Sequence, residues 1–169
     1  MSIQIGKKAP AIKGVDQNGA KISLADFKGK KVALYFYPKD NTPGCTAQAC
    51  NLEENSALLK KKGIVVVGVS TDSVASHKKF ETKFNLSFPL IADESKEIVT
   101  AYEVWGEKKF MGRTYMGTNR VTFLINEKGE ITQYNNCYRT SYGSINELIN
   151  EMFPNILGNN TFFSALNYF

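Results

Sequence analysis

The fold is decided by one stretch of the chain, Tyr35-Phe36-Tyr37-Pro38-Lys39-Asp40-Asn41-Thr42-Pro43-Gly44-Cys45-Thr46-Ala47-Gln48-Ala49-Cys50. It starts inside an apolar strand, Val32 to Tyr37, which Pro38 ends because proline has no amide hydrogen for the sheet ladder. After a polar turn, Thr42 and Pro43 are typical of the N-cap and first position of a helix. Cys45 then falls in the first turn of that helix, where free N–H groups and the helix dipole favour an anion. Thiolates, the nucleophilic form of cysteine, are favoured at such a position.

Strands and helices alternate on both sides of this stretch. We expect strands over 32–37, 64–70, 88–91, 121–125 and 130–134, and helices over 43–62, 73–84, 95–102 and 144–153. Two strands, 32–37 and 64–70, are almost wholly apolar and should be central, whereas 88–91 is of edge type. An Asn18-Gly19 turn predicts a β-hairpin within 11–23, residues 24–29 form a short helical turn, and 105–119 is expected to be a loop. This order predicts an α/β protein with a thioredoxin-like arrangement: a central mixed sheet flanked by helices, with an N-terminal β-hairpin.

Length and composition indicate one domain with an ample core. The chain has 169 residues, of which 43% are hydrophobic, and we assign residues 1–153 to the domain and 154–169 to an apolar C-terminal extension. No apolar run approaches the roughly 20 residues of a membrane helix, and the start lacks a signal core, which predicts a cytoplasmic protein without a membrane partner. The net charge is +5, but the lysines are scattered along the chain, which favours solvated faces over a nucleic-acid groove.

The three cysteines, Cys45, Cys50 and Cys137, do not form a structural disulfide framework, because their number is odd and the core is ample. Cys45 and Cys50 lie five residues apart on one predicted helix. That spacing corresponds to about 7.5 Å of rise and about 140° of rotation, so the two Cα atoms should lie roughly 8–9 Å apart. A disulfide needs less than about 7 Å. Either the two cysteines never pair, or the helix unwinds locally when they do.

Three kinds of site compete for this pair of cysteines. A zinc site is weakly supported, because the spacing is Cys-x4-Cys and the chain has one histidine. A thioredoxin-type oxidoreductase would need Cys-x-x-Cys at this place. A peroxidatic thiolate followed by a resolving thiol agrees best with the spacing. A rival of another class is a redox sensor or binding module, without enzymatic activity, in which the disulfide switches affinity for a partner.

The pattern Pro38-x-x-x-Thr42-x-x-Cys45 resembles the signature of the peroxiredoxins, and the Cys45 to Cys50 spacing resembles their bacterioferritin comigratory protein, or peroxiredoxin Q, branch. Three further segments agree with that branch: 68–72, 105–112 and 120–125. The resemblance covers roughly residues 5–153. It implies an atypical 2-Cys, thioredoxin-dependent peroxidase that reduces hydrogen peroxide and small organic hydroperoxides without metal, haem or flavin.

The resemblance also implies a role for each matching residue. Cys45 would be the peroxidatic cysteine that becomes a sulfenic acid, and Cys50 would resolve it as an intramolecular disulfide that thioredoxin, or a similar thiol reductant, reduces. Thr42 would hydrogen-bond the thiolate and the peroxide, while Pro38 shields the pocket from water. Arg120, at the start of a strand, would place its cation beside the sulfur.

The remaining notable residues are not assigned a catalytic role. We place His77 on a polar helix face, outside the chemistry, and interpret Cys137 as a spectator thiol. Trp105 and Phe110 either line the mouth of the pocket or pack in the core. The tail beyond Pro154 is richer in apolar residues than a solvated end should be. It predicts packing onto its own or a neighbouring chain, hence a monomer or a weak homodimer formed through the tail.

Overall fold

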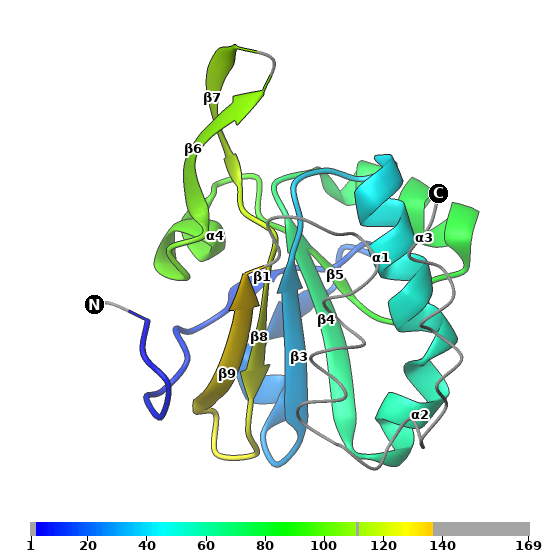
Figure 1. The fold of residues 1–169 in the computed structure, drawn as a ribbon. Helices are drawn as coiled ribbons and strands as arrows, with labels where there is room; N and C mark the ends of the chain where they lie inside the picture. Colours follow the sequence, from blue (N-terminus) through cyan, green and yellow to red (C-terminus); the bar gives the residue numbers. More distant parts are fainter. Residues whose placement is uncertain (1–2, 111, 137–169) are drawn as a thin grey trace, which may run out of the picture.

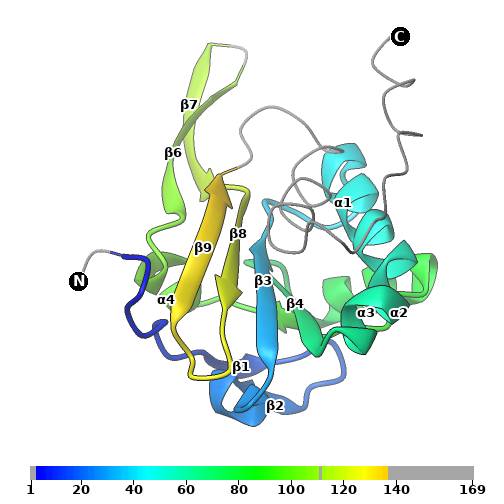
Figure 2. The ribbon, with the colours of Figure 1, turned by 60° about the horizontal axis from the view of Figure 1, so that its bottom comes forward.

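A seven-stranded mixed sheet forms the centre of the molecule (Figures 1 and 2), in a computed structural model that describes residues 3–110 and 112–136. The strand order is β2-β1-β5-β4-β3-β8-β9. The strands are β1 (Lys13–Val15), β2 (Lys21–Ser23), β3 (Lys31–Phe36), β4 (Ile64–Ser70), β5 (Leu90–Ala92), β8 (Val121–Ile125) and β9 (Ile131–Asn136). Strands β3, β4 and β5 are mutually parallel, whereas β8 runs antiparallel to β3 and β1 antiparallel to β5. The prediction of a mixed sheet with an N-terminal hairpin, β1–β2, is confirmed.

Helices cover both faces of this sheet (Figure 1). Helices α1 (Pro43–Glu54), α2 (Ser56–Lys61) and α3 (Val74–Phe84) pack on one face, and α4 (Glu97–Ala101) packs on the other. A short 3-10 turn, η1 (Leu24–Phe27), follows β2. The alternation of side chains along β3 divides the core: Ala33, Tyr35 and Tyr37 face α1 to α3, while Val32, Leu34 and Phe36 face α4. All six are buried, which explains the continuous apolar run in the sequence.

The register of β3 and β4 is set by a close contact in the middle of the sheet. Tyr35 pairs with Gly68, and a Cβ atom on Gly68 would lie 2.9 Å from the Tyr35 ring and 2.7 Å from Leu90 Cδ2. The glycine therefore leaves room for the tyrosine ring. Tyr35 stacks on Tyr37 with 5.2 Å between ring centroids, so the aromatic residues before Pro38 form one packed unit.

Three predicted elements differ from the structure. The helix predicted over 43–62 is divided at Asn55, whose φ and ψ of −94° and 2° leave the α-helical region and separate α1 from α2. The prediction of an edge strand at 88–91 is wrong, because β5 lies between β1 and β4. The N-terminal hairpin covers what would otherwise be its free edge.

The loop predicted over 105–119 is also wrong. Strands β6 (Trp105–Phe110) and β7 (Arg113–Thr118) form an antiparallel ribbon that projects from the body (Figure 1), with Gly112 at a φ of 76° in its turn. Only the base of the ribbon, at Trp105 and Thr118, packs on the body, so its sequence lacks the apolar alternation that marks a strand. Tyr115 and Met116 are about half exposed on it.

Three predictions fall outside the described residues: the helix over 144–153, the role of Cys137 and the packing of the 154–169 extension. The division of the chain into a domain and an extension stays a prediction for the same reason. Among the residues that the structure describes, no helix has the length and apolarity to cross a bilayer.

Candidate active site

Cys45 lies in the first turn of α1 and is 1% exposed. Its sulfur accepts a hydrogen bond from Arg120 Nη2 at 3.2 Å. Arg120 directly precedes β8, which pairs with β3, and α1 follows β3 through the Pro38–Thr42 turn. The order of neighbouring strands therefore brings two residues 75 positions apart in the sequence into contact.

Gln48 holds the same guanidinium from the next turn of α1. Arg120 Nη1 donates to Gln48 Oε1, so both terminal nitrogens of the arginine are engaged, one with the sulfur and one with the amide. Gln48 is buried, and its Nε2 has no partner within the described part of the chain. Gln48 is not among the residues predicted for the site. Its position three residues after Cys45, on the same helical face, is the signal that could have identified it.

Thr42 and Pro38 lie where the sequence predicts, but the proton of the Thr42 hydroxyl points neither to the end of α1 nor to the Cys45 sulfur, where the thiolate contact is expected. Thr42 occupies the N-cap of α1 and Pro43 its first position, but the Thr42 side chain makes no capping hydrogen bond. Its hydroxyl instead donates to the Lys39 carbonyl at 3.0 Å. Pro38 is half-buried just beyond β3. The Thr42 hydroxyl thus uses its hydrogen in a bond within the loop. Its oxygen lone pairs remain able to accept a hydrogen bond from another group.

Cys50 lies further along α1, half-buried and unpaired. Burial raises the pKa of its thiol, and the carboxylate of Glu54 on the following turn raises it further. The two cysteines therefore differ in surroundings: the sulfur of Cys45 contacts a cation, whereas Cys50 lies near an anion. Both are free thiols on one intact helix, and its geometry holds them too far apart to pair.

Lys108 brings a second cation toward the site from the projecting ribbon. Burial lowers the pKa of its ammonium, the Arg120 charge lowers it further, and Cys45 acts in the opposite direction. The scattered lysines, Lys108 among them, are predicted to lie on solvated faces, so the proximity of Lys108 to Arg120 and Cys45 is a finding of the structure. It comes from a strand that the sequence pattern does not reveal.

The remaining candidates lie apart from this cluster or outside the description. Trp105 packs partly buried against the core on the α4 side, with Lys96 Nζ 5.0 Å from its ring centroid. The side chain of Phe110 is outside the described residues. His77 is fully buried, so its predicted place on a polar helix face is wrong. Within the described ranges, no group of three or more His, Cys, Asp and Glu side chains could hold a metal ion.

Residues 5–134 match the AhpC/TSA family. The chain is 47% identical to the putative peroxiredoxin Bcp of Haemophilus influenzae over 131 residues, which is 78% of this chain and 84% of that protein. It is 44% identical to peroxiredoxin Bcp of Escherichia coli over 139 residues, covering 82% of this chain and 89% of that one.

Solved structures agree with these relatives. PrxQ of Xylella fastidiosa superposes with a TM-score of 0.83 at 28% identity, covering 90% of this chain and 96% of that one. Peroxiredoxin Q of Xanthomonas campestris gives a TM-score of 0.78 at 30% identity, covering 86% and 91%. The thioredoxin-like fold expected from the sequence is thereby confirmed. With a buried thiol, a guanidinium on its sulfur and these relatives, the chain belongs to the AhpC/TSA family as a peroxiredoxin of the Bcp/PrxQ branch, a thiol-dependent peroxidase.

Proposed function

We propose that Cys45 is the peroxidatic cysteine of this peroxidase and that Arg120 activates it. The observation that supports the proposal most directly is the hydrogen bond of 3.2 Å from Arg120 Nη2 to Cys45 Sγ. A guanidinium at this distance favours the thiolate and stabilises the charge that develops on the peroxide oxygens. Gln48 keeps the guanidinium in that orientation, because it accepts a hydrogen bond from the other terminal nitrogen.

In the first step the Cys45 thiolate attacks the terminal oxygen of the peroxide. The new S–O bond forms as the O–O bond breaks, and the other oxygen leaves as an alkoxide or hydroxide that takes up a proton. The products are an alcohol or water and a sulfenic acid on Cys45. Thr42 Oγ1 donates its hydrogen bond to the Lys39 carbonyl, so its lone pairs can accept a hydrogen bond from the peroxide hydroxyl. Pro38 would shield the reacting atoms from bulk water.

In the second step Cys50 attacks the sulfenic sulfur, and a Cys45–Cys50 disulfide forms with release of water. This step requires α1 to unwind, because an intact helix separates the two Cα atoms by roughly 8–9 Å. Two features of α1 favour unwinding: Thr42 does not cap the helix through its side chain, and the buried Gln48 Nε2 and Asn51 Oδ1 have no partner among the described residues. Unwinding would also expose Cys50 to water and so remove the burial that raises its pKa.

The peroxiredoxin family acts on peroxides with a thioredoxin-like reductant. We propose that thioredoxin itself, or a similar dithiol, reduces the Cys45–Cys50 disulfide of this protein. Hydrogen peroxide and small organic hydroperoxides are the proposed substrates. A cytoplasmic location and a monomer or weak homodimer stay predictions, to be tested by cell fractionation and by analytical ultracentrifugation of the full chain.

The deciding experiment measures NADPH consumption with thioredoxin, thioredoxin reductase and hydrogen peroxide, comparing the wild type with Cys45→Ser and Cys50→Ser. We expect no turnover from Cys45→Ser and a single oxidation without turnover from Cys50→Ser. Peptide mapping of the oxidised wild type should recover Cys45 joined to Cys50. Undiminished turnover by Cys45→Ser would refute the peroxidatic assignment. Turnover by Cys50→Ser would move the resolving role to Cys137 or to the thiol of the reductant.

A further inference from the structure

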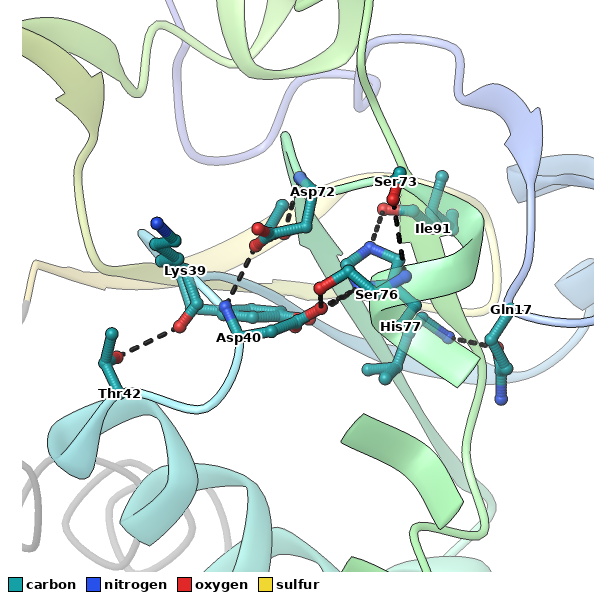
Figure 3. A network of polar contacts seen from close by, with 12 residues as sticks. Gln17, Lys39, Asp40, Thr42, Asp72, Ser73, Ser76, His77 and Ile91 are labelled. Carbon is teal, nitrogen blue, oxygen red and sulfur yellow. Dashed lines mark hydrogen bonds and ion pairs between the residues drawn. The ribbon is translucent and has the colours of Figure 1, made fainter. Parts of the chain in front are cut away.

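A second polar cluster lies buried behind the loop that carries Thr42 (Figure 3). His77, on α3, is 0% exposed and makes a contact of 2.8 Å between its Nδ1 and Asp40 Oδ2. Its other ring nitrogen, Nε2, lies 3.1 Å from the carbonyl oxygen of Ile91 on β5. A histidine and an aspartate that are both buried form a costly pair, and breaking one partner away from such a pair is strongly destabilising.

The partners of the ring determine which nitrogens bear protons. A backbone carbonyl only accepts, so Nε2 donates its proton to Ile91. Lone pairs on both Nδ1 and Asp40 Oδ2 would repel each other at 2.8 Å, so a proton lies between them as well. The contact is therefore a hydrogen bond, and the His77 ring is held at both ends.

Asp40 is fixed just as completely. Its Oδ1 accepts from the Tyr37 hydroxyl at 2.8 Å, and its Oδ2 accepts from the Ser76 hydroxyl at 2.7 Å. Its backbone N–H donates to Asp72 Oδ2 at 2.9 Å. Burial by itself would raise the pKa of the Asp40 carboxyl, but the hydrogen bond and charge of His77, with the two hydroxyls, outweigh it and lower that pKa. Asp40 thus attaches the loop to Tyr37 just beyond β3, to α3 and to the turn before α3.

This attachment is transmitted to Thr42 through the backbone on both sides of Asp40. The preceding residue, Lys39, supplies the carbonyl that accepts the Thr42 hydroxyl at 3.0 Å. The following residue, Asn41, has a φ of 56°, in the left-handed region that non-glycine residues seldom adopt. Figure 3 shows the path from His77 through Asp40 and Lys39 to Thr42. Immobilising Asp40 therefore fixes the direction of the Lys39 carbonyl and, with it, the rotamer of Thr42.

We propose that His77 and Asp40 are a positioning pair for the peroxide pocket: they hold the Lys39 carbonyl so that Thr42 presents its lone pairs to the substrate hydroxyl. The proposal rests on the assignment of Thr42 as a substrate contact. Neither His77 nor Asp40 touches the sulfur or takes part in proton transfer.

The test compares two reactions of the Cys45 thiolate in the full-length protein. Oxidation by hydrogen peroxide in a single turnover needs the substrate hydroxyl to be positioned, whereas alkylation by iodoacetamide needs only the thiolate. Both are followed by mass mapping of the Cys45 peptide. Because misplacement by about 1 Å can cost about a hundredfold, we expect His77→Leu to lower the oxidation rate constant by roughly ten- to a hundredfold. Its alkylation rate constant should stay within about twofold of the wild type.

Five further variants make the test specific. His77→Asn offers an amide N–H near the place of Nδ1 and should recover part of the oxidation rate, whereas the exposed neighbour Lys79→Gln should match the wild type. Asp40→Asn combined with His77→Leu removes the pair without leaving an unpaired buried charge, so it should fold and still oxidise slowly. Thr42→Val combined with His77→Leu should be no slower than Thr42→Val alone, because both changes remove the same interaction.

The outcomes separate this proposal from the peroxidatic assignment. Slow oxidation of Cys45 in the wild type would refute that assignment. If the wild type, His77→Leu and the Asp40→Asn/His77→Leu double variant all oxidise equally fast, the proposed positioning role of the pair is refuted. If alkylation of Cys45 in the variants becomes faster as oxidation slows, the site has opened, and the pair is merely structural. His77 is the one histidine of the chain, so NMR can assign its ring directly. We expect a slowly exchanging, downfield Nδ1 proton, and a rapidly exchanging ring would contradict the buried pair.

Discussion

Arg120→Met isolates the contribution of the guanidinium to catalysis. Methionine keeps much of the length and apolar character of the side chain but removes the donor that lies 3.2 Å from the Cys45 sulfur. A hydrogen bond to a charged group contributes about 1.5–3 kcal/mol. If the bond acts fully in the transition state, each 1.36 kcal/mol changes the rate about tenfold, so the loss should be roughly ten- to 150-fold. Arg120→Lys should lie between the two proteins, because it keeps the charge but cannot engage Cys45 and Gln48 together.

The assay is the second-order rate constant for oxidation of Cys45 by hydrogen peroxide, measured by rapid mixing and mapped to the Cys45 peptide. Arg113→Met is the matched control, because Arg113 is an exposed arginine on β7 and the same atoms are removed. It should oxidise at the wild-type rate. An Arg120→Met protein that oxidises within about threefold of the wild type would refute the argument, since the contact would then be structural and not catalytic.

Three more perturbations test other parts of the structure. Gly68→Ala forces a Cβ to within 2.9 Å of the Tyr35 ring and should lower the free energy of unfolding in urea by about 1–3 kcal/mol. Burial is the larger cause of the raised Cys50 pKa, and the Glu54 charge is the second. Glu54→Gln removes that charge, so the pH profile of Cys50 alkylation should move to lower pH. Because the folded pKa of Asp40 lies below its unfolded value of about 3.9, its stabilising contribution is complete above that pH and is lost as pH falls through the folded pKa. Asp40→Asn should thus be less stable at pH 7 and show a shallower loss of stability in urea between pH 7 and pH 3.

Each of these has a contrasting outcome. Gly106→Ala, whose Cβ would have its nearest neighbour at 3.6 Å, should unfold close to the wild type, and equal losses in both glycine variants would discredit the packing argument. Glu94 is an exposed acid on another part of the chain, so Glu94→Gln should leave the pH profile of Cys50 alkylation unchanged. If the free energy of unfolding falls equally between pH 7 and pH 3 in the wild type and in Asp40→Asn, another carboxyl controls the acid transition.

The sequence predicts those elements of the fold that have a local signature, such as an apolar run or a turn dipeptide. Buried strands β3 and β4 are continuous apolar runs, and the Asn18-Gly19 turn marks the first hairpin. The ribbon β6–β7 has no such pattern, because only its base, at Trp105 and Thr118, packs on the body. The interior place of β5 is equally hidden, since it depends on pairing with β1, far away in the sequence.

The candidate site shows the same division. The spacing of Thr42, Cys45 and Cys50 can be read along one segment, but Arg120 and Lys108 come from elsewhere in the chain, and Gln48 lies one helical turn further along α1. His77 could have been identified by a closer reading: with Phe80 and Phe84 it follows the i, i+3, i+7 spacing of a buried stripe. The polar residues Ser76 and Lys78 on either side of His77 make the segment resemble a solvated helix face instead. Its partner Asp40 comes from another element, and no local pattern joins the two.

The break at Asn55 has a mechanical consequence. It divides a run of helix into two units: α2 packs on the core through the buried Leu59, and α1, which carries both cysteines, packs through Ala49, Leu52 and Cys45. A helix as short as the 12 residues of α1 is marginal by itself, so its order depends on what it packs against. An opening of α1 can therefore end at Asn55 without loosening the α2 contacts. If α1 unwinds as proposed for disulfide formation, the junction at Asn55 would confine the loss of helix to the segment that bears the thiols and leave the rest of the domain folded.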